Sequence, residues 1–125
     1  MTATDSQNLV PIGSYIAETH LVAMIRQEPA EIIRTSRADF CRSYDDLDYL
    51  VFAVMSLPSG DRLGLIRHEN SPAPGTEICV RPDQKHVPAV LRQAMAEMNL
   101  SITDFTWIHP EYEQQLRDRF LNPQN

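Results

Sequence analysis

The longest apolar stretch of the chain predicts a strand near its centre. Residues Tyr49–Leu57 (YLVFAVMSL) are apolar or aromatic at nearly every position, which is typical of a strand buried on both faces. Four residues that favour a turn, Pro58–Asp61, come next, and Leu63–His68 then returns as a second strand. Because short turns join antiparallel neighbours, the pattern predicts a hairpin from Tyr49 to Glu69.

One glycine in the returning strand predicts a local irregularity. We expect Leu57 to face Arg62 across the turn, and this register places Gly64 opposite Met55. A glycine inside a strand often marks a bulge or a place where another part of the chain comes close. The sequence therefore predicts a bulge or a close approach at Gly64.

A third, shorter strand is predicted over Thr76–Arg81. Its apolar residues Ile78 and Val80 share one face, and Cys79 lies on the other. Pro82 ends it, because proline cannot donate to a strand ladder. We expect this strand to form an exposed edge of the sheet, and such edges are usually paired or covered.

Helical spacing of apolar residues appears first near the N-terminus. Ser14 is a suitable N-cap, and apolar residues recur at positions 17, 21, 24 and 25, the spacing of one helix face. Pro29 interrupts this pattern and suits the first turn of a new helix. We predict helices over residues 14–27 and 29–37, and a single kinked helix is the alternative.

The second half of the chain carries the strongest helical pattern. Asn99 suits the C-terminal cap of this helix, and its apolar stripe consists of Val87, Val90, Leu91, Ala94, Met95 and Met98. A last helix is predicted from Pro110, with Glu111 and Glu113 in the first turn, where the helix dipole favours negative charge. Residues 102–108 between these helices form a possible fourth strand.

The predicted elements define an α+β fold in the order α-α-β-β-β-α-(β)-α. We expect a small antiparallel sheet of three to four strands, with helices packed mainly on one face. The 125 residues fit a single domain, residues 1–125, with flexible ends at about residues 1–12 and 122–125.

Charge and hydropathy narrow the class of partner. The formal net charge is −6, which argues against non-specific binding to nucleic acid or to anionic membranes, because both require a cationic surface. No apolar run approaches the eighteen or so residues of a membrane-spanning helix, and residues 1–8 contain no apolar segment typical of a secretory signal. The sequence therefore predicts a cytoplasmic protein with no nucleic-acid or membrane partner.

The residue types that usually carry catalysis or bind metals show no familiar spacing. His20, His68, His86 and His109 and the two cysteines form no pattern typical of a zinc site, and no glycine-rich phosphate loop is present. We expect no metal and no cofactor. An enzyme remains an alternative only if the fold collects two or more of His68, Cys79, His86 and His109 beside a carboxylate.

Two segments are candidate binding surfaces. Arg81, Lys85 and His86 lie between a predicted strand end and a helix start, where cations and free backbone N–H groups favour an anionic ligand. A second cluster combines four residues that suit a partner-binding surface, since tryptophan and tyrosine anchor many interfaces: Phe105, Trp107, His109 and Tyr112.

The predicted element order and the acidic charge are similar to those of small acidic secretion chaperones. This resemblance implies a dimer that holds a partner chain. We therefore expect a non-enzymatic protein-interaction or regulatory module, homodimeric and chaperone- or adaptor-like. The alternatives are a small anionic-ligand-binding domain that uses Arg81–His86, and a small enzyme whose site is assembled only in the fold.

Overall fold

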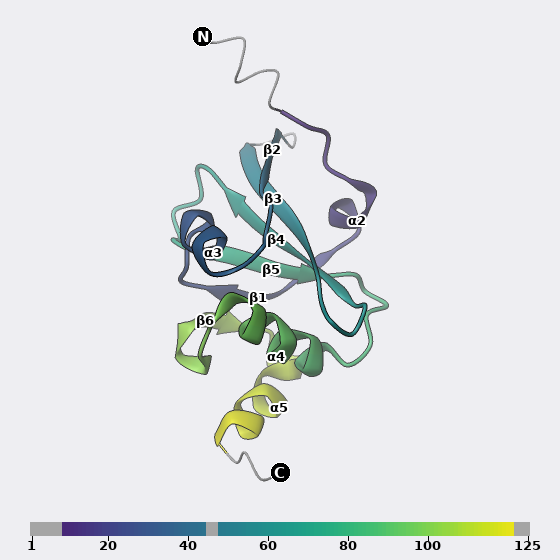
Figure 1. Cartoon of the computed structure of the whole chain (residues 1–125), viewed down its shortest axis with the longest axis vertical. Helices are drawn as coiled ribbons and strands as arrows, with labels where there is room; N and C mark the ends of the chain where they lie inside the picture. The colour runs from purple at the N-terminus through teal and green to yellow at the C-terminus, as the bar shows by residue number, and fades with distance from the viewer. Residues whose placement is uncertain (1–8, 45–47, 122–125) are drawn as a thin grey trace.

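The computed structural model describes residues 9–44 and 48–121, with side chains to residue 118. Within this part the chain forms one antiparallel six-stranded sheet and four α-helices (Figure 1), so the predicted α+β class is confirmed. The elements in order are α2 (Ser14–Ala17), β1 (His20–Ile25), α3 (Pro29–Thr35), β2 (Cys41–Tyr44), β3 (Tyr49–Ser56), β4 (Arg62–His68), β5 (Thr76–Val80), α4 (Val87–Met98), the 3-10 turn η1 (Ile102–Asp104), β6 (Phe105–Ile108) and α5 (Pro110–Leu121).

The strands lie side by side in the order β2-β3-β4-β5-β1-β6. β2 to β5 form a meander of neighbours along the chain, whereas β1 inserts between β5 and β6 and pairs with both. β5 is therefore an interior strand, and the prediction that Thr76–Arg81 forms an exposed edge was wrong. β1, which the sequence did not predict as a strand, covers that edge.

The first predicted helix is mostly a strand. The helix ends at Ala17, and residues 20–25 form β1. Val22, Ala23 and Ile25 have almost no exposed surface, so β1 is buried as a central strand. Helical spacing fitted positions 21, 24 and 25, but residues 21–25 (LVAMI) are all apolar and fit a central strand equally well. Pairing with two neighbouring strands decided the outcome.

The predicted sheet of three to four strands was also too small. β1 and β2 are additional strands, and the predicted fourth strand is present as β6, shortened by the 3-10 turn at residues 102–104. β2 (CRSY) is short and polar, as edge strands often are. Beside it, Val10 N donates to the Arg42 carbonyl at 2.8 Å, so residues 9 and 10 lie against β2.

The predicted hairpin is confirmed, with its register one residue away from the expected one. Leu57 N donates to the Asp61 carbonyl at 2.9 Å, and Gly64 consequently lies opposite Val54. The ladder is continuous at Gly64, so the structure supports a close approach there and no bulge. A Cβ added to Gly64 would lie 2.6 Å from Ile16 Cδ1, which shows that α2 packs directly on this glycine.

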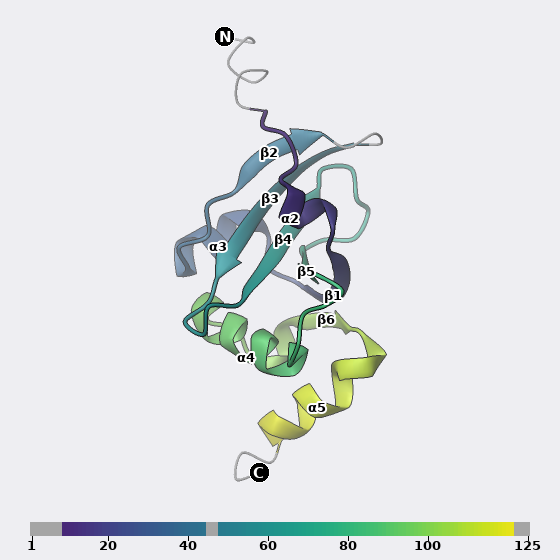
Figure 2. The same ribbon diagram turned by 90° about the vertical axis from the view of Figure 1, so that its right-hand side faces the viewer.

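The two faces of the sheet carry separate apolar cores. Helices α3, α4 and α5 bury Ile32, Leu91 and Leu116 on one face. On the other face, α2 buries Tyr15 and Ile16 in a smaller cluster with side chains of β3, β4 and β5. Figure 2 shows α2 in front of the sheet and α3 behind it. The helices thus lie mainly on one face, as predicted.

Candidate functional site

The most unusual backbone feature of the sheet is an unpaired half of β3. β2 pairs with β3 only from Tyr49 to Phe52, whereas β3 continues to Ser56. Leu57 N donates to the Asp61 carbonyl, just before β4, and the Tyr49 carbonyl accepts from Glu69 N, just after it. The odd-numbered residues of β3 therefore turn their polar groups toward β4. Because these groups alternate along an antiparallel strand, Val54 and Ser56 turn theirs away from β4, where β2 no longer reaches.

These outward-facing groups have no protein partner in the described part of the chain. No hydrogen bond joins the outward N–H or C=O of Val54 or Ser56 to another described residue. The Val54 side chain is 39% exposed, although it lies inside the most apolar stretch of the sequence. We call residues 53–56 the open half of β3.

A pocket of about 680 Å³ lies along the open half of β3. Its lining comes from three parts of the fold: the connection from α3 to β2, the strand with its following turn, and α4. The lining residues are Arg37, Ala38, Val54, Met55, Ser56, Leu57, Pro58 and Glu97. The turn is fixed to α4, because Ser59 N donates to Gln93 Oε1 at 3.2 Å. The pocket is therefore built on rigid elements.

Two exposed charges of opposite sign border this pocket. Arg37 precedes β2 and Glu97 lies in the last turn of α4. Within the described residues neither one forms an ion pair or a side-chain hydrogen bond. The pocket therefore offers an apolar strand edge together with one cation and one anion that are free to meet a partner.

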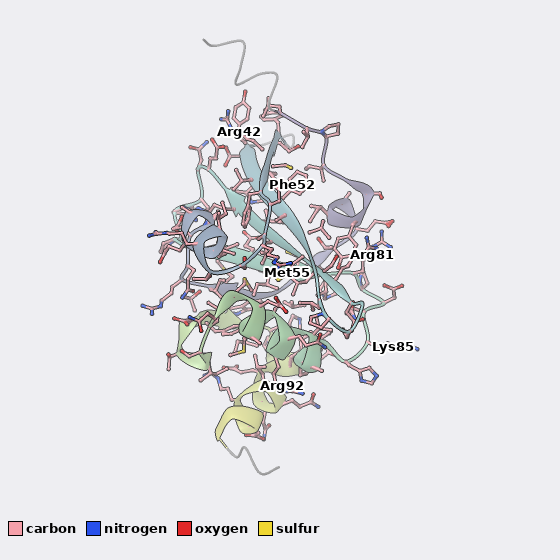
Figure 3. All side chains as sticks on the ribbon, in the orientation of Figure 1. Arg42, Phe52, Met55, Arg81, Lys85 and Arg92 are labelled. Carbon is pink, nitrogen blue, oxygen red and sulfur yellow. The ribbon has the colours of Figure 1, made fainter. Side chains whose placement is uncertain are left out.

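The predicted anion-binding segment is split by the structure. Arg81 Nη2 lies 3.8 Å from Glu18 Oε2, and the guanidinium carbon lies 4.9 Å from the centre of the Tyr15 ring. Lys85 and His86 are exposed at the start of α4. Figure 3 shows Arg81 beside α2 and Lys85 farther along the loop, pointing away from the body of the protein. Arg81 thus contacts α2 and does not converge with Lys85.

The predicted aromatic cluster is brought together in part. The rings of Trp107 and His109 lie 5.9 Å apart, and those of His109 and Tyr112 lie 5.5 Å apart. Trp107 is 38% exposed. Phe105 is buried in the larger core instead. We call Trp107, His109 and Tyr112 the aromatic surface; it lies at the β6 edge, on the opposite side of the sheet from β2.

The residues considered for catalysis are distributed over different elements. Burial, reinforced by the nearby carboxylate of Glu77, raises the pKa of the Cys79 thiol to about 12, so this thiol is protonated at neutral pH. His68 Nδ1 lies 3.9 Å from Glu77 Oε2. His86 lines a separate pocket of about 360 Å³ with Glu111 and Tyr112. Across residues 9–44 and 48–121, no three His, Cys, Asp or Glu side chains gather as metal ligands would.

No helix in the described part of the chain has the length and apolar character needed to cross a bilayer. Comparisons with protein-family models, with curated proteins and with solved structures found no match for this chain.

Sequence reasoning missed the open half of β3 because it depends on a length difference between two neighbouring strands. β3 has eight residues and β2 has four, and β2 carries too few apolar residues to be recognised as a strand. The available signal was Ser56, a polar residue near the end of an otherwise apolar strand.

Proposed function

We propose that the chain is a non-enzymatic protein-interaction module that adds an extended segment of a partner protein to the open half of β3. The observation that carries this proposal is the pair of outward-facing backbone units at Val54 and Ser56, which lie along a pocket and have no partner among the described residues. Strand addition to an exposed sheet edge is a common mode of peptide recognition.

The geometry of the edge suits a short extended segment. Val54 and Ser56 are two residues apart, so their outward groups are separated by about 7 Å. A segment paired with both residues gains up to four main-chain hydrogen bonds, two from N–H groups and two to carbonyls. Its side chain opposite Met55 projects to the helix-covered face, where the pocket also presents Ala38 and Leu57.

The surroundings of the edge favour a single segment over a second folded copy. The connection at Arg37 and Ala38 and the end of α4 at Glu97 border the same pocket. A slender peptide can enter between them, whereas a second β3 carries the same flanking elements and would bring them into collision. Main-chain pairing needs little sequence identity in the partner, which fits an adaptor- or chaperone-like role.

The test uses the full chain and a randomised nonapeptide display library. Peptides selected on the wild-type protein are measured by fluorescence anisotropy against Ser56→Pro. Proline removes the outward N–H and places its ring on the side where the peptide would pair, while the ladder to β4 needs no N–H from this residue. We expect Ser56→Pro to weaken binding at least tenfold.

The matched control is Thr106→Pro, which introduces the same residue into β6 at a position that β1 does not pair. We expect this variant to bind the selected peptides as the wild type does. Equal binding by wild type and a folded Ser56→Pro variant would show that the peptides bind elsewhere and would refute the proposal. A library that yields no peptide above background would also count against it.

A further inference from the structure

Arg62 at the start of β4 and Arg81 after the end of β5 both contact α2, which covers this face of the sheet. Gly64 and Cys79 form the last pair of the β4–β5 ladder. Extending its register by two residues places Arg62 opposite Arg81, which lies just past the end of β5. Like charges directly opposite each other on neighbouring strands repel and destabilise the pair. An arrangement of this kind therefore needs something that compensates the repulsion.

Tyr15 of α2 compensates part of the repulsion between the two arginines. The guanidinium carbons of Arg62 and Arg81 lie 4.7 Å and 4.9 Å from the centre of the Tyr15 ring, within the range of cation–π attraction. The Tyr15 hydroxyl donates to the Arg62 carbonyl at 2.8 Å. One aromatic ring therefore contacts both guanidinium groups.

The hydrogen-bonding capacity of both guanidinium groups remains unused by the described protein. Neither Arg62 nor Arg81 donates a hydrogen bond to another described residue, and Arg81 Nε is buried without a partner there. The nearest carboxylate is Glu18, which is 60% exposed and lies 3.8 Å from Arg81, beyond hydrogen-bonding distance. Asp83 is also close enough to act on Tyr15. Both guanidinium groups thus contact one ring. Glu18 forms an ion pair with Arg81, but neither guanidinium donates a hydrogen bond to a carboxylate of the described residues.

We propose that Arg62 and Arg81, supported by Tyr15, form a binding site for an oxyanion, either a phosphate or a carboxylate group of a small ligand. Guanidinium forks match the geometry of both groups and bind them with two hydrogen bonds each. A bound oxyanion neutralises the facing charges and uses N–H donors that the protein leaves open. Lys85 and His86 lie farther along the chain and are not part of this site.

The experiment is isothermal titration calorimetry of the full chain with inorganic phosphate and, separately, with succinate, at constant ionic strength. We expect saturable binding to the wild type. Removing one fork in Arg62→Gln or Arg81→Gln should weaken binding about tenfold or more, because hydrogen bonds to charged groups contribute strongly. Arg62→Lys keeps the positive charge but loses the forked pair of donors. Its affinity for the anion should therefore lie between that of the wild type and that of Arg62→Gln. The control Arg34→Gln removes one exposed cation from α3 and should bind as the wild type does.

Each outcome decides the proposal. Binding of phosphate alone identifies a phosphoryl ligand, and binding of succinate as well extends the site to carboxylates. The proposal is overturned if neither anion binds, if sodium chloride competes equally well, or if Arg34→Gln weakens binding as much as Arg62→Gln does. Arg62→Gln keeps the backbone carbonyl that accepts from Tyr15, so its thermal melting point should stay near that of the wild type. The titrations contain no peptide, so the result is independent of peptide binding at β3.

Discussion

Gly75 is the residue at which the backbone leaves the least freedom. Its φ is +98°, and a Cβ at this position would lie 1.9 Å from the Ile25 carbonyl oxygen. The Gly75 N–H also donates to the Glu28 carboxylate. The start of β5 can therefore approach the end of β1 only without a side chain at this position.

Substitutions at three glycines should separate the two causes of this constraint. Gly13 has an ordinary φ and open space around it, whereas Gly60 has a φ of +92° and open space. We expect Gly13→Ala to change the free energy of unfolding by less than about 0.5 kcal/mol and Gly60→Ala to lower it by about 1 kcal/mol. Gly75→Ala should lower it by about 3 kcal/mol or more, because a backbone clash is added to the φ strain. Urea unfolding measures all three, and a Gly75→Ala variant as stable as Gly13→Ala would contradict the structure.

Asp104 is a buried carboxylate that joins the ends of β1 and β6. Its oxygens accept from Ser101 N at 2.9 Å and from Arg26 Nε at 2.7 Å. The backbone hydrogen bond from Ser101, helped by Arg26 and opposed by burial, lowers the pKa of Asp104 to about 2. The spacing Ser101-x-x-Asp104 is a capping-box pattern that was visible in the sequence, although nothing there indicated that Asp104 is buried.

The lowered pKa of Asp104 makes stability depend on pH in the acid range. A group whose pKa is lower in the folded state stabilises the fold above its unfolded-state pKa, here near 3.8, and this contribution disappears as the pH falls through about 2. We expect Asp104→Asn to lower the free energy of unfolding by about 1 kcal/mol at pH 7, a discounted value because Arg26 is largely exposed to water. The difference from wild type should shrink between pH 4 and pH 2 in urea titrations. Asp39→Asn, at an exposed carboxylate, is the control, and an unchanged difference at both pH values would contradict the assignment.

At the scale of elements, the local sequence pattern predicted the secondary structure correctly where only one type of element fitted it. It failed where a helix and a strand fitted it equally well. The run Tyr49–Leu57 is too apolar and β-branched for a surface helix, and it forms β3 as predicted. The run His20–Ile25 fits a helix face and a buried strand alike, and only its pairing with β5 and β6 made it a strand. No local pattern contains that information, because both partners lie more than fifty residues away along the chain.

Prediction of the candidate sites from the sequence was limited even more by contacts between elements. Trp107, His109 and Tyr112 are close in sequence, and the structure places their rings together as expected from β6 and the adjacent first turn of α5. The partner of Arg81 was invisible in the sequence, because Arg62 and Tyr15 reach it only through the strand register and the position of α2. The open half of β3 required the length of β2 to be known.

At the scale of the whole molecule, the two candidate interaction surfaces lie at opposite sides of the sheet. The aromatic surface is at the β6 edge, and the open half of β3 is next to β2. The homodimer that the sequence predicts can therefore form through the aromatic surface without blocking the pocket. Exposed tryptophan and tyrosine are the residues that most often anchor such contacts.

Light scattering coupled to size-exclusion chromatography tests this arrangement. We expect a mass of twice 14.3 kDa at high micromolar concentration, and we expect Trp107→Ala to raise the dissociation constant of the dimer at least tenfold. Ser56→Pro should remain dimeric, because it changes the other side of the sheet. A monomeric wild-type protein, or a Ser56→Pro variant that alone dissociates, would show that the dimer does not use the aromatic surface.

The insertion of β1 between β5 and β6 also has a consequence for how the chain folds. The hairpins of the β2–β5 meander close short loops, whereas β1 must pair with β5 and with β6 over far longer separations along the chain. Closing longer loops costs more entropy, and contacts that are distant in sequence slow folding. During synthesis on the ribosome, β1 is made first, yet it cannot complete its pairing until residue 108 has emerged. A nascent chain can therefore pair β1 with β5 once residue 80 has emerged, but the opposite edge of β1 stays unpaired until β6 has been synthesised.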